Sequence, residues 1–185
     1  LVVPEGAAVP EGLPASITVL QKPLDHVYLA ATSAMDLIAA LDRTDRITLS
    51  GTKESGWYVE AAKEAMEEGT LAYAGKYSAP DYEQILSSGC DLALESTMIY
   101  HNPEVKEKLE EFGIPVLVEH SSYENHPLGR TEWVKLYGAL LDKEEEAETV
   151  FEEQAEKLNS IKDSENTGKT VGFLLYQFHG LCQCA

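Results

Sequence analysis

The sequence is poor in features that mark several large classes of protein. Only 14 of its 185 residues are Lys or Arg, against 32 Asp and Glu, so the formal net charge is −18. Phosphate binding requires a basic face, and this balance argues against nucleic acid as a partner. No run of about 18 apolar residues is present that could span a membrane. Three cysteines, Cys90, Cys182 and Cys184, do not make a disulfide framework.

The common nucleotide and hydrolase motifs are also missing. Neither a G-x-G-x-x-G fingerprint nor a phosphate-binding P-loop follows the first expected strand, where the sequence reads "AATSAM". No serine stands in a nucleophile elbow. We therefore expect a protein that is not an enzyme. An open α/β enzyme for a nucleotide or a metal-linked substrate is the alternative, and a non-catalytic interaction domain is a third hypothesis.

What is present is a regular alternation of strand-like and helix-like segments in a chain that is 44% hydrophobic. Short apolar runs predict the strands, and 3.6-residue spacing with Gly or Pro boundaries predicts the helices. Ser33 is the expected N-cap of the first helix. The expected strands are 26–32, 46–51, 71–75, 90–97 and 114–122, and the expected helices are 33–42, 56–69, 78–89 and 102–113.

This alternation predicts the α/β class, with a mostly parallel sheet flanked by helices. Parallel strands end at one edge of a sheet, and ligands bind beyond that edge. We divide the chain into an N-terminal arm (1–22), a first α/β lobe (23–128), one long linking helix (129–163) with a bend near Gly138 or Asp142, and the start of a second lobe (164–185).

Four segments in this order resemble one known family. They are "VYLAATSAMDLIAALD", "YAGKYSAPDYEQILSSGCDLALES", "VKEKLEEFGIPVLVE" and "LYGALLDKEEEAE". Together they resemble the periplasmic-binding-protein family of the iron-siderophore and cobalamin type, the substrate-binding components of ABC importers. The resemblance implies two α/β lobes joined by a long helix, with the ligand in the cleft between the lobes. It covers one lobe and the helix.

The resemblance also implies a function and a location. We expect a binding component for an iron-siderophore, haem, cobalamin or a related metal chelate, held outside the cytoplasm as a periplasmic protein or cell-surface lipoprotein whose signal segment is absent from this chain. No cofactor is expected besides that ligand. The ABC importer permease is the expected partner, and Glu83 matches the family's acidic permease-docking position in the Pro-led helix. An ordinary solvated Glu is the alternative.

The C-terminal sequence "LLYQFHGLCQCA" continues the expected second lobe poorly. A frameshift near Leu174 that truncates the protein is our hypothesis for it. Without a second lobe, the apolar stripe of the linking helix and the strand "TVGFLLY" would lack cover, so a homodimer is expected.

Ligand contacts are expected in the loops that follow the strands. The loop "SSYENHPLGRTEW" offers Tyr123, His126 and Arg130, and Arg suits an anionic oxygen because its planar fork donates two bonds. Alternatively, Arg130 pairs with Glu124 or Glu132. Core packing is the stronger expectation for Trp133 and an equal alternative for Trp57 and Tyr58. The expected ligand-binding residues are Ser33, Lys53, Trp57, Tyr58, Lys76, Tyr77, Glu95, Tyr100, Tyr123, His126 and Arg130.

A metal site made by the protein alone is not expected. His101, His120 and His126 have carboxylates near them in sequence, but none shows compact ligand spacing. Glu119 and His120 are adjacent on an expected strand, so their side chains point to opposite faces.

Overall fold

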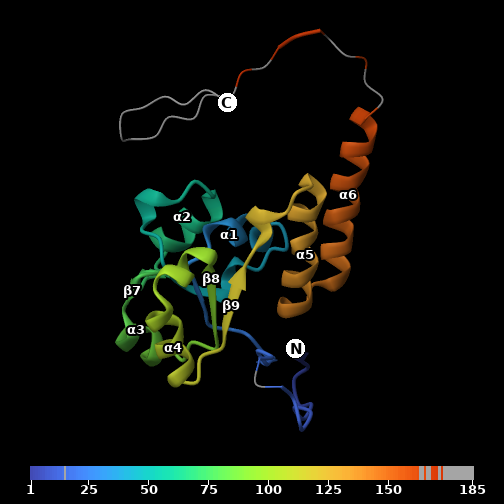
Figure 1. The fold of residues 1–185 in the computed structure, drawn as a ribbon. Coiled ribbons are helices and arrows are strands. Elements are labelled where there is room, and N and C mark those ends of the chain that lie inside the picture. Colours follow the sequence, from blue (N-terminus) through green and yellow to red (C-terminus); the bar gives the residue numbers. More distant parts are fainter. Residues whose placement is uncertain (15, 163–164, 166–167, 171, 173–185) are drawn as a thin grey trace.

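The computed structural model describes residues 1–14, 16–162, 165, 168–170 and 172 (Figure 1). The strands are β1 (Val2–Val3), β2 (Leu20–Gln21), β3 (Val27–Leu29), β4 (Ile47–Ser50), β5 (Ala72–Tyr73), β6 (Gly75–Lys76), β7 (Ala79–Pro80), β8 (Leu92–Ser96) and β9 (Val116–Glu119). The α-helices are α1 (Thr32–Ala39), α2 (Glu60–Glu67), α3 (Tyr82–Ser87), α4 (Pro103–Glu111), α5 (Pro127–Leu141) and α6 (Glu144–Lys162). Short 3-10 helices are η1 (Thr44–Arg46), η2 (Glu54–Gly56), η3 (Thr97–His101) and η4 (Ser121–Tyr123).

A five-stranded sheet in the order β5-β4-β3-β8-β9 forms the centre of the lobe. Every pair in it is parallel, which confirms the predicted α/β class. The chain moves from β3 outward in one direction and later from β8 outward in the other. The direction of winding therefore reverses between β3 and β8, and this is where open α/β sheets characteristically bind ligands.

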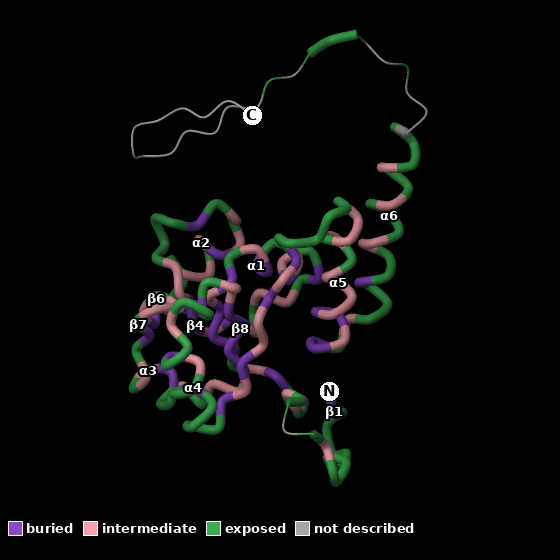
Figure 2. Tube along the Cα trace, viewed as in Figure 1, coloured by how far each residue is buried: buried purple, intermediate pink, exposed green. Residues whose placement is uncertain are grey.

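The helices cover both faces of this sheet. On one face, Leu29 and Leu94 pack with Met35 of α1 and with residues of α5. On the other, Tyr28 and Ala93 pack with residues of α3 and α4. The strands are consequently buried on both sides, as Figure 2 shows for β4 and β8. A side chain at a strand end enters one layer or the other, according to the alternation of the strand.

Two helix starts differ from the prediction. Ser33 does not cap α1, because the N-cap residue is Ala31 and makes no side-chain cap bond. Helix α2 begins at Glu60 and not at Gly56. The chain instead forms η2, and Trp57 then turns into the core, where its Nε1 donates to Ser50 Oγ at 3.2 Å.

The segment before α3 holds a hairpin that the sequence analysis missed. Strands β6 and β7 pair antiparallel, and Pro80 ends β7 where the prediction placed it in a helix. Asp81 caps α3 by accepting the Gln84 N–H at 3.0 Å. Gly75 has a positive φ of 81°, and a Cβ there would lie 2.4 Å from the Ala79 carbonyl oxygen. Only glycine therefore fits this turn.

The predicted linking helix is two helices. Asp142 adopts the left-handed conformation with φ 57°, which ends α5 and lets α6 start at Glu144. The two helices lie side by side and antiparallel (Figure 1). α5 begins where β9 ends, and α6 returns past that level. The expected bend near Gly138 or Asp142 is thus a complete break at Asp142. The prediction of a single helix was wrong because no proline or glycine stands at the break and the left-handed conformation is rare in other residues.

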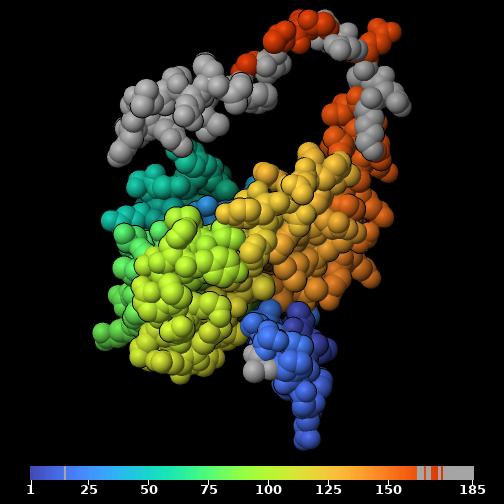
Figure 3. Space-filling model, in the orientation of Figure 1, coloured from blue at the N-terminus to red at the C-terminus, as the bar shows by residue number. Residues whose placement is uncertain are grey.

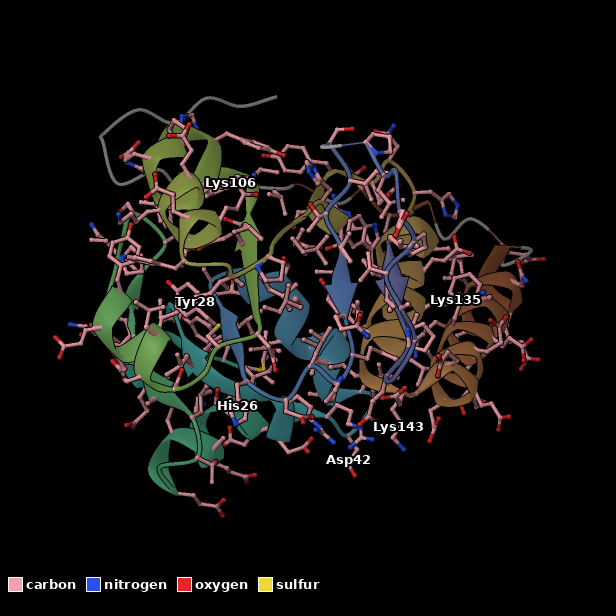
Figure 4. The ribbon with its side chains drawn as sticks, turned by 90° about the horizontal axis from the view of Figure 1, so that it is seen from below. His26, Tyr28, Asp42, Lys106, Lys135 and Lys143 are labelled. Carbon is pink, nitrogen blue, oxygen red and sulfur yellow. The ribbon has the colours of Figure 1, made fainter. Side chains whose placement is uncertain are left out.

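Close packing joins the two helices near the break. A Cβ on Gly138 would lie 2.6 Å from the Ala147 Cβ and 2.8 Å from the Lys143 carbonyl oxygen. Farther along, Lys135 Nζ pairs with Glu148 at 3.0 Å and lies 4.1 Å from the ring centre of Phe151. Figure 4 shows Lys135 in the space between α5 and α6. The first half of α6 is thus fixed to the lobe.

The second half of α6 extends past α5 and has much less cover (Figure 2). Leu158 is half-buried, and 61% of Ile161 is exposed. The expected homodimer through such surfaces stays a prediction. Among the described residues, no helix, α6 included, is both long and apolar enough to cross a bilayer.

The N-terminal arm is more ordered than a linker. Strand β1 pairs with β2, and Val3 and Leu20 are buried. Lys22, only 9% exposed, donates to the Ala139 carbonyl oxygen at 3.1 Å and pairs with Asp142 at the end of α5. The arm projects from the body (Figure 3), at the end opposite to the one toward which β9 points (Figure 1). The expected second-lobe strand, Cys182, Cys184 and the frameshift position lie outside the described residues.

The contact at Gly138 predicts a large effect of one methyl group. Gly138→Ala should lower the free energy of unfolding by about 1–3 kcal/mol, because the new Cβ meets backbone and a buried Cβ that cannot move freely. Urea unfolding followed by circular dichroism measures this.

The matched control is Gly129→Ala on the same helix. The nearest atom to its Cβ would be Glu124 Oε2 at 3.1 Å, the end of a flexible side chain. Alanine also favours the helix by up to about 1 kcal/mol. Equal destabilisation by the two substitutions would contradict the packing described for α5 and α6.

Candidate functional site

The five strands of the central sheet end together, and we call this end of the lobe the carboxyl edge. The loops that follow the strands there are residues 30–33, 51–58, 74–78, 97–101 and 120–130. All five loops supply exposed or half-buried polar or aromatic side chains. The arrangement at the edge decides which of the predicted residues can meet a ligand.

Two tyrosines, a histidine and a threonine meet between the ends of β8 and β9. Tyr100 Oη lies 3.3 Å from His120 Nε2, and Thr97 Oγ1 donates to Tyr123 Oη at 2.9 Å. The His120 ring centre is 6.2 Å from the ring centres of both tyrosines. We call these four residues the phenol cluster.

The phenol cluster is open to solvent. Tyr100 is 57% exposed and Tyr123 is 68% exposed, while Thr97 and His120 are half-buried. Large apolar rings are usually covered when they serve the core, so exposed rings with hydroxyl groups at a strand edge indicate a contact surface. The cluster brings together two of the predicted residues, Tyr100 and Tyr123.

The strand register explains the cluster. Ser96 pairs with Glu119 in the parallel ladder, so the next residues, Thr97 and His120, leave the sheet side by side. Each strand then enters a 3-10 turn, η3 or η4. These turns bring Tyr100 and Tyr123 back over the strand ends.

The buried side chain of Glu119, at the end of β9, links the elements beneath the phenol cluster. It is 3% exposed; its Oε1 accepts the Ser121 N–H at 2.6 Å and its Oε2 accepts the Ser33 hydroxyl at 2.5 Å. Ser33 therefore joins α1 to η4 through this carboxylate. The predicted residue Ser33 stands at the edge, but its hydroxyl is already engaged.

Glu95, also predicted to bind ligand, points into the other layer. It is fully buried, and among the described residues neither of its carboxyl oxygens has a hydrogen-bond partner. Burial raises its pKa to about 8. The pKa of Tyr28 is raised by burial and then by the charge of Glu95, and the Tyr28 hydroxyl donates to the Gly75 carbonyl oxygen at 3.0 Å. Figure 4 shows Tyr28 in the interior of the lobe.

A second exposed group lies beyond β4 and β5. The Lys53 ammonium is 5.5 Å from the ring centre of Tyr73, and Tyr58 is 94% exposed. Lys53 and Tyr58 are thus accessible, and the core alternative is wrong for Tyr58. Trp57 is only 4% exposed and packs in the core, so the core alternative holds for it. Lys76 and Tyr77 belong to β6 and to the turn between β6 and β7.

The loop between Ser121 and Trp133 uses most of its polar groups to fold itself. His126 Nδ1 accepts the Leu128 N–H at 3.1 Å and so caps α5. Arg130 Nε donates to the Glu124 carbonyl oxygen at 3.3 Å, and Trp133 Nε1 donates to Glu124 Oε1 at 3.1 Å. A shallow pocket lined by Glu124, Gly129, Glu132, Trp133 and Leu136 opens beside it.

The carboxyl edge differs in charge from the rest of the chain. Its loops at 51–58, 74–78, 97–101 and 120–130 carry three Lys or Arg and two Glu side chains, although the whole chain has 32 acids and 14 bases. An anionic ligand would meet little repulsion here. Within the described part of the chain, no group of three or more His, Cys, Asp and Glu side chains could hold a metal ion.

Comparison with known proteins shows to which family the fold belongs. The family described as periplasmic binding protein matches residues 27–181. The chain belongs to this family. An uncharacterized lipoprotein of Methanocaldococcus jannaschii is 27% identical over 167 residues, which are 87% of this chain and 40% of that protein.

Solved structures of periplasmic binding proteins share the fold. The periplasmic haem-binding protein HutB of Vibrio cholerae superposes with a TM-score of 0.63 at 16% identity, over 84% of this chain and 56% of that one. An ABC-type Fe³⁺-hydroxamate transport protein of Saccharomonospora viridis gives 0.54 at 19% identity, over 75% and 50%. These relatives are two-lobe solute-binding proteins, and this chain spans about half of their length.

Two members of the phenol cluster, Thr97 and His120, were not among the expected ligand-binding residues. His120 was weighed only as a metal ligand beside Glu119, and Thr97 was not considered. The sequence carries a signal for both, since each directly follows an apolar strand. What it lacks is the register of β8 against β9, which decides that the two residues are neighbours.

The buried carboxyl of this periplasmic binding protein predicts a pH effect. The pKa of Glu95 is about 8 in the folded chain against an ordinary 4.5. Between these values the folded chain keeps a proton that the unfolded chain has released, so this group lowers stability as pH rises through that window. Glu95→Gln should therefore gain stability relative to the native chain from pH 5 to pH 8, by on the order of 3 kcal/mol. Urea unfolding at each pH measures the difference.

Glu119→Gln is the matched substitution on the neighbouring strand. It replaces one of two acceptor oxygens that are both in use, and it should destabilise the chain by about 1–3 kcal/mol. Opposite signs at pH 8 are expected for the two variants. A Glu95→Gln variant that loses as much stability as Glu119→Gln at pH 8 would show that Glu95 is paired in the folded protein.

Proposed function

We propose that this chain is part of the substrate-binding component of an ABC importer for a metal chelate: an iron-siderophore, haem, cobalamin or a related complex. The observation that carries this proposal is the exposed phenol cluster at the carboxyl edge, beside the point where the winding of the sheet reverses. Its rings offer contact area to a flat or aromatic ligand, and its hydroxyl and imidazole groups offer hydrogen bonds to anionic oxygens.

The family and its structures support the binding role. HutB is a periplasmic haem-binding protein, and the S. viridis protein belongs to an Fe³⁺-hydroxamate transport system. Both ligands are metal complexes with extended organic frames. The M. jannaschii relative is a lipoprotein, which supports a location outside the cytoplasm for this chain as well.

The carboxyl edge would form one wall of the binding cleft. Tyr58, Lys53 and the phenol cluster stand along it and are accessible. His126 and Arg130 can contribute only where their present bonds to the loop leave donors free. We assign Trp57 and Glu95 a supporting role, because both are buried beneath the edge.

Titration of the chain with ferric chelates, haem and cobalamin tests the proposal. Tyr123→Ala should weaken binding of the true ligand about tenfold, since the loss of one aromatic contact and one hydrogen bond is worth about 1.4 kcal/mol or more. Isothermal calorimetry measures the affinity, and circular dichroism checks the fold.

The control is Tyr82→Phe, which removes a phenol oxygen away from the edge. The Tyr82 ring packs edge-to-face against Phe112 at 5.8 Å. The variant should bind as the native chain does. Failure of the native chain to bind any metal complex would refute the proposed ligand class.

Glu83 is the proposed contact to the permease. It is exposed in the first turn of α3, and no ion pair engages it among the described residues. An exposed carboxylate can pair with a basic side chain of a partner at little desolvation cost.

Reversal of this charge should impair transport and leave ligand binding intact. Glu83→Arg should reduce uptake into proteoliposomes that hold an ABC permease of this importer class by about tenfold, because like charges then face each other. Glu107→Arg, on the exposed side of α4, is the matched control. Equal uptake by the Glu83→Arg variant and the native chain would rule out this contact.

A further inference from the structure

A buried carboxyl group lies directly beneath the carboxyl edge, and the proposed ligand contacts make no use of it. Glu95 is fully buried, and neither of its carboxyl oxygens has a hydrogen-bond partner among the described residues. It pairs with Val118 in the ladder between β8 and β9, one residue before the end of each strand. Ser96 follows and is the N-cap of η3, the turn that carries Tyr100 of the phenol cluster. Glu95 thus stands just below the proposed ligand surface.

Within the described part of the chain, the surroundings of Glu95 offer nothing that would balance an ionised carboxylate. The layer that it enters is built from apolar side chains, among them Ile85 of α3 and Ile99 of η3, which are both fully buried. A buried carboxylate without a cation or a donor is so costly that the group keeps its proton instead. Burial accordingly raises the pKa of Glu95 to about 8. The group is therefore uncharged at neutral pH.

The other titratable groups inside this layer keep their protons over the range in which Glu95 ionises. Burial raises the pKa of Tyr28 and of Tyr82, and the charge of Glu95 contributes to both shifts. Burial also raises the pKa of the Cys90 thiol, to about 11. The neighbouring elements β5, α4 and η3 add side chains that are exposed, namely Tyr73, Glu104, Lys108, Tyr100 and His101.

We propose that Glu95 makes the carboxyl edge select metal complexes by charge: the edge accepts a negatively charged complex while Glu95 is protonated, and ionisation of Glu95 weakens the binding of that complex. This inference rests on the proposed function and narrows its ligand class to anionic metal complexes. Glu95 is a specificity-determining residue that acts through its charge and does not touch the ligand.

The charge of the edge fits this role. Its loops at 51–58, 74–78, 97–101 and 120–130 carry three Lys or Arg and two Glu side chains, which is an excess of one positive charge. Such an excess favours an anionic ligand as long as no further negative charge lies close by. A proton on Glu95 preserves the excess, and its loss places a negative charge directly beneath the edge.

Distance and dielectric set the size of the effect. A strand rises about 3.3 Å per residue, so a complex seated on η3 and the phenol cluster would lie roughly 10 Å from the Glu95 carboxyl group. Two unit charges about 10 Å apart, at an effective dielectric constant of about 20, change an equilibrium constant on the order of tenfold. The effect on affinity is therefore large enough to measure.

The sign of the pH effect follows from linkage. A bound anion favours the neutral carboxyl group, so binding takes up protons near pH 8 and the affinity falls as pH rises from 7 to 9. A bound cation favours the carboxylate, so binding releases protons and the affinity rises over the same range. The two kinds of ligand should thus show opposite trends.

Two ferric complexes that differ only in charge test the inference on the full 185-residue chain. One is the ferric complex of a linear trihydroxamate with a terminal amine, which is a cation because an amine of this kind stays protonated to about pH 10. The other is the same complex with the amine succinylated, which is an anion. Isothermal calorimetry should show that the affinity for the anion falls about threefold to tenfold from pH 7 to pH 9, while the affinity for the cation rises.

Glu95→Gln keeps the shape of the side chain and cannot ionise. It should abolish the opposite pH trends of the two complexes, whereas the matched control Glu107→Gln, on the exposed side of α4, should keep them. Other titratable groups are the same in both variants, so the difference isolates Glu95. Circular dichroism at pH 7 and pH 9 checks the fold. Calorimetry of the native chain in two buffers with different ionisation enthalpies measures the proton uptake without any substitution.

The outcomes separate this inference from the proposed function. An equal loss of affinity for both complexes at pH 9 would mean that ionisation opens the fold, and it overturns selection by charge. Opposite trends that survive Glu95→Gln overturn the assignment to Glu95. Both results leave the chelate-binding function standing. A native chain that binds neither complex at either pH overturns the inference, and it refutes the proposed function as well only where haem and cobalamin also fail to bind.

Discussion

The parallel pairing of β8 with β9 is the constraint on which the site depends. It sets Ser96 opposite Glu119, and from that register follow the meeting of Thr97 with His120 and the return of Tyr100 and Tyr123 over the strand ends. A shift of one residue in the register of β9 against β8 would turn every side chain of β9 to the opposite face of the sheet. Glu119 would then lose Ser33 and Ser121. The phenol cluster is therefore a consequence of the backbone pairing of β8 with β9.

Two buried carboxyl groups at neighbouring strand ends show how strongly the face of the sheet that a side chain enters affects its environment. Glu119 enters the layer of α1 and α5, where a hydroxyl and a backbone N–H satisfy it. Glu95 enters the layer of α3 and α4, where no described donor reaches it and burial keeps it protonated near neutral pH. One group ties three elements together, and the other lowers stability wherever it ionises. Both lie under the surface that the ligand would touch.

The class of fold and the order of the main elements could be predicted from the sequence, because alternating patterns and Gly or Pro boundaries are local signals, and the same signals show which loops follow the strands at the carboxyl edge. A bend near Gly138 or Asp142 was also expected, but not that Asp142 would end the helix in the left-handed conformation and let α6 fold back against α5. The opposite exposures of Trp57 and Tyr58, which are adjacent and similar in type, also depend on tertiary packing, since Trp57 packs in the core and bonds to Ser50. Tyr100 and Tyr123 were predicted individually, but their meeting through His120 needed the strand register.

The two halves of α6 differ in how firmly they are held: the first half packs against α5, and the second half has little cover. The first half is fixed to the lobe by two groups of contacts. Gly138 packs against Ala147, and Lys135 contacts Glu148 and Phe151. The eleven residues that follow Phe151 within the helix span about 16 Å. A bend in the first half of α6 would disrupt its close packing against α5, whereas a bend in the second half would break few tertiary contacts. A domain attached to the C-terminal end of α6 would therefore move by bending of the outer turns of α6, while the carboxyl edge of the lobe would keep its position.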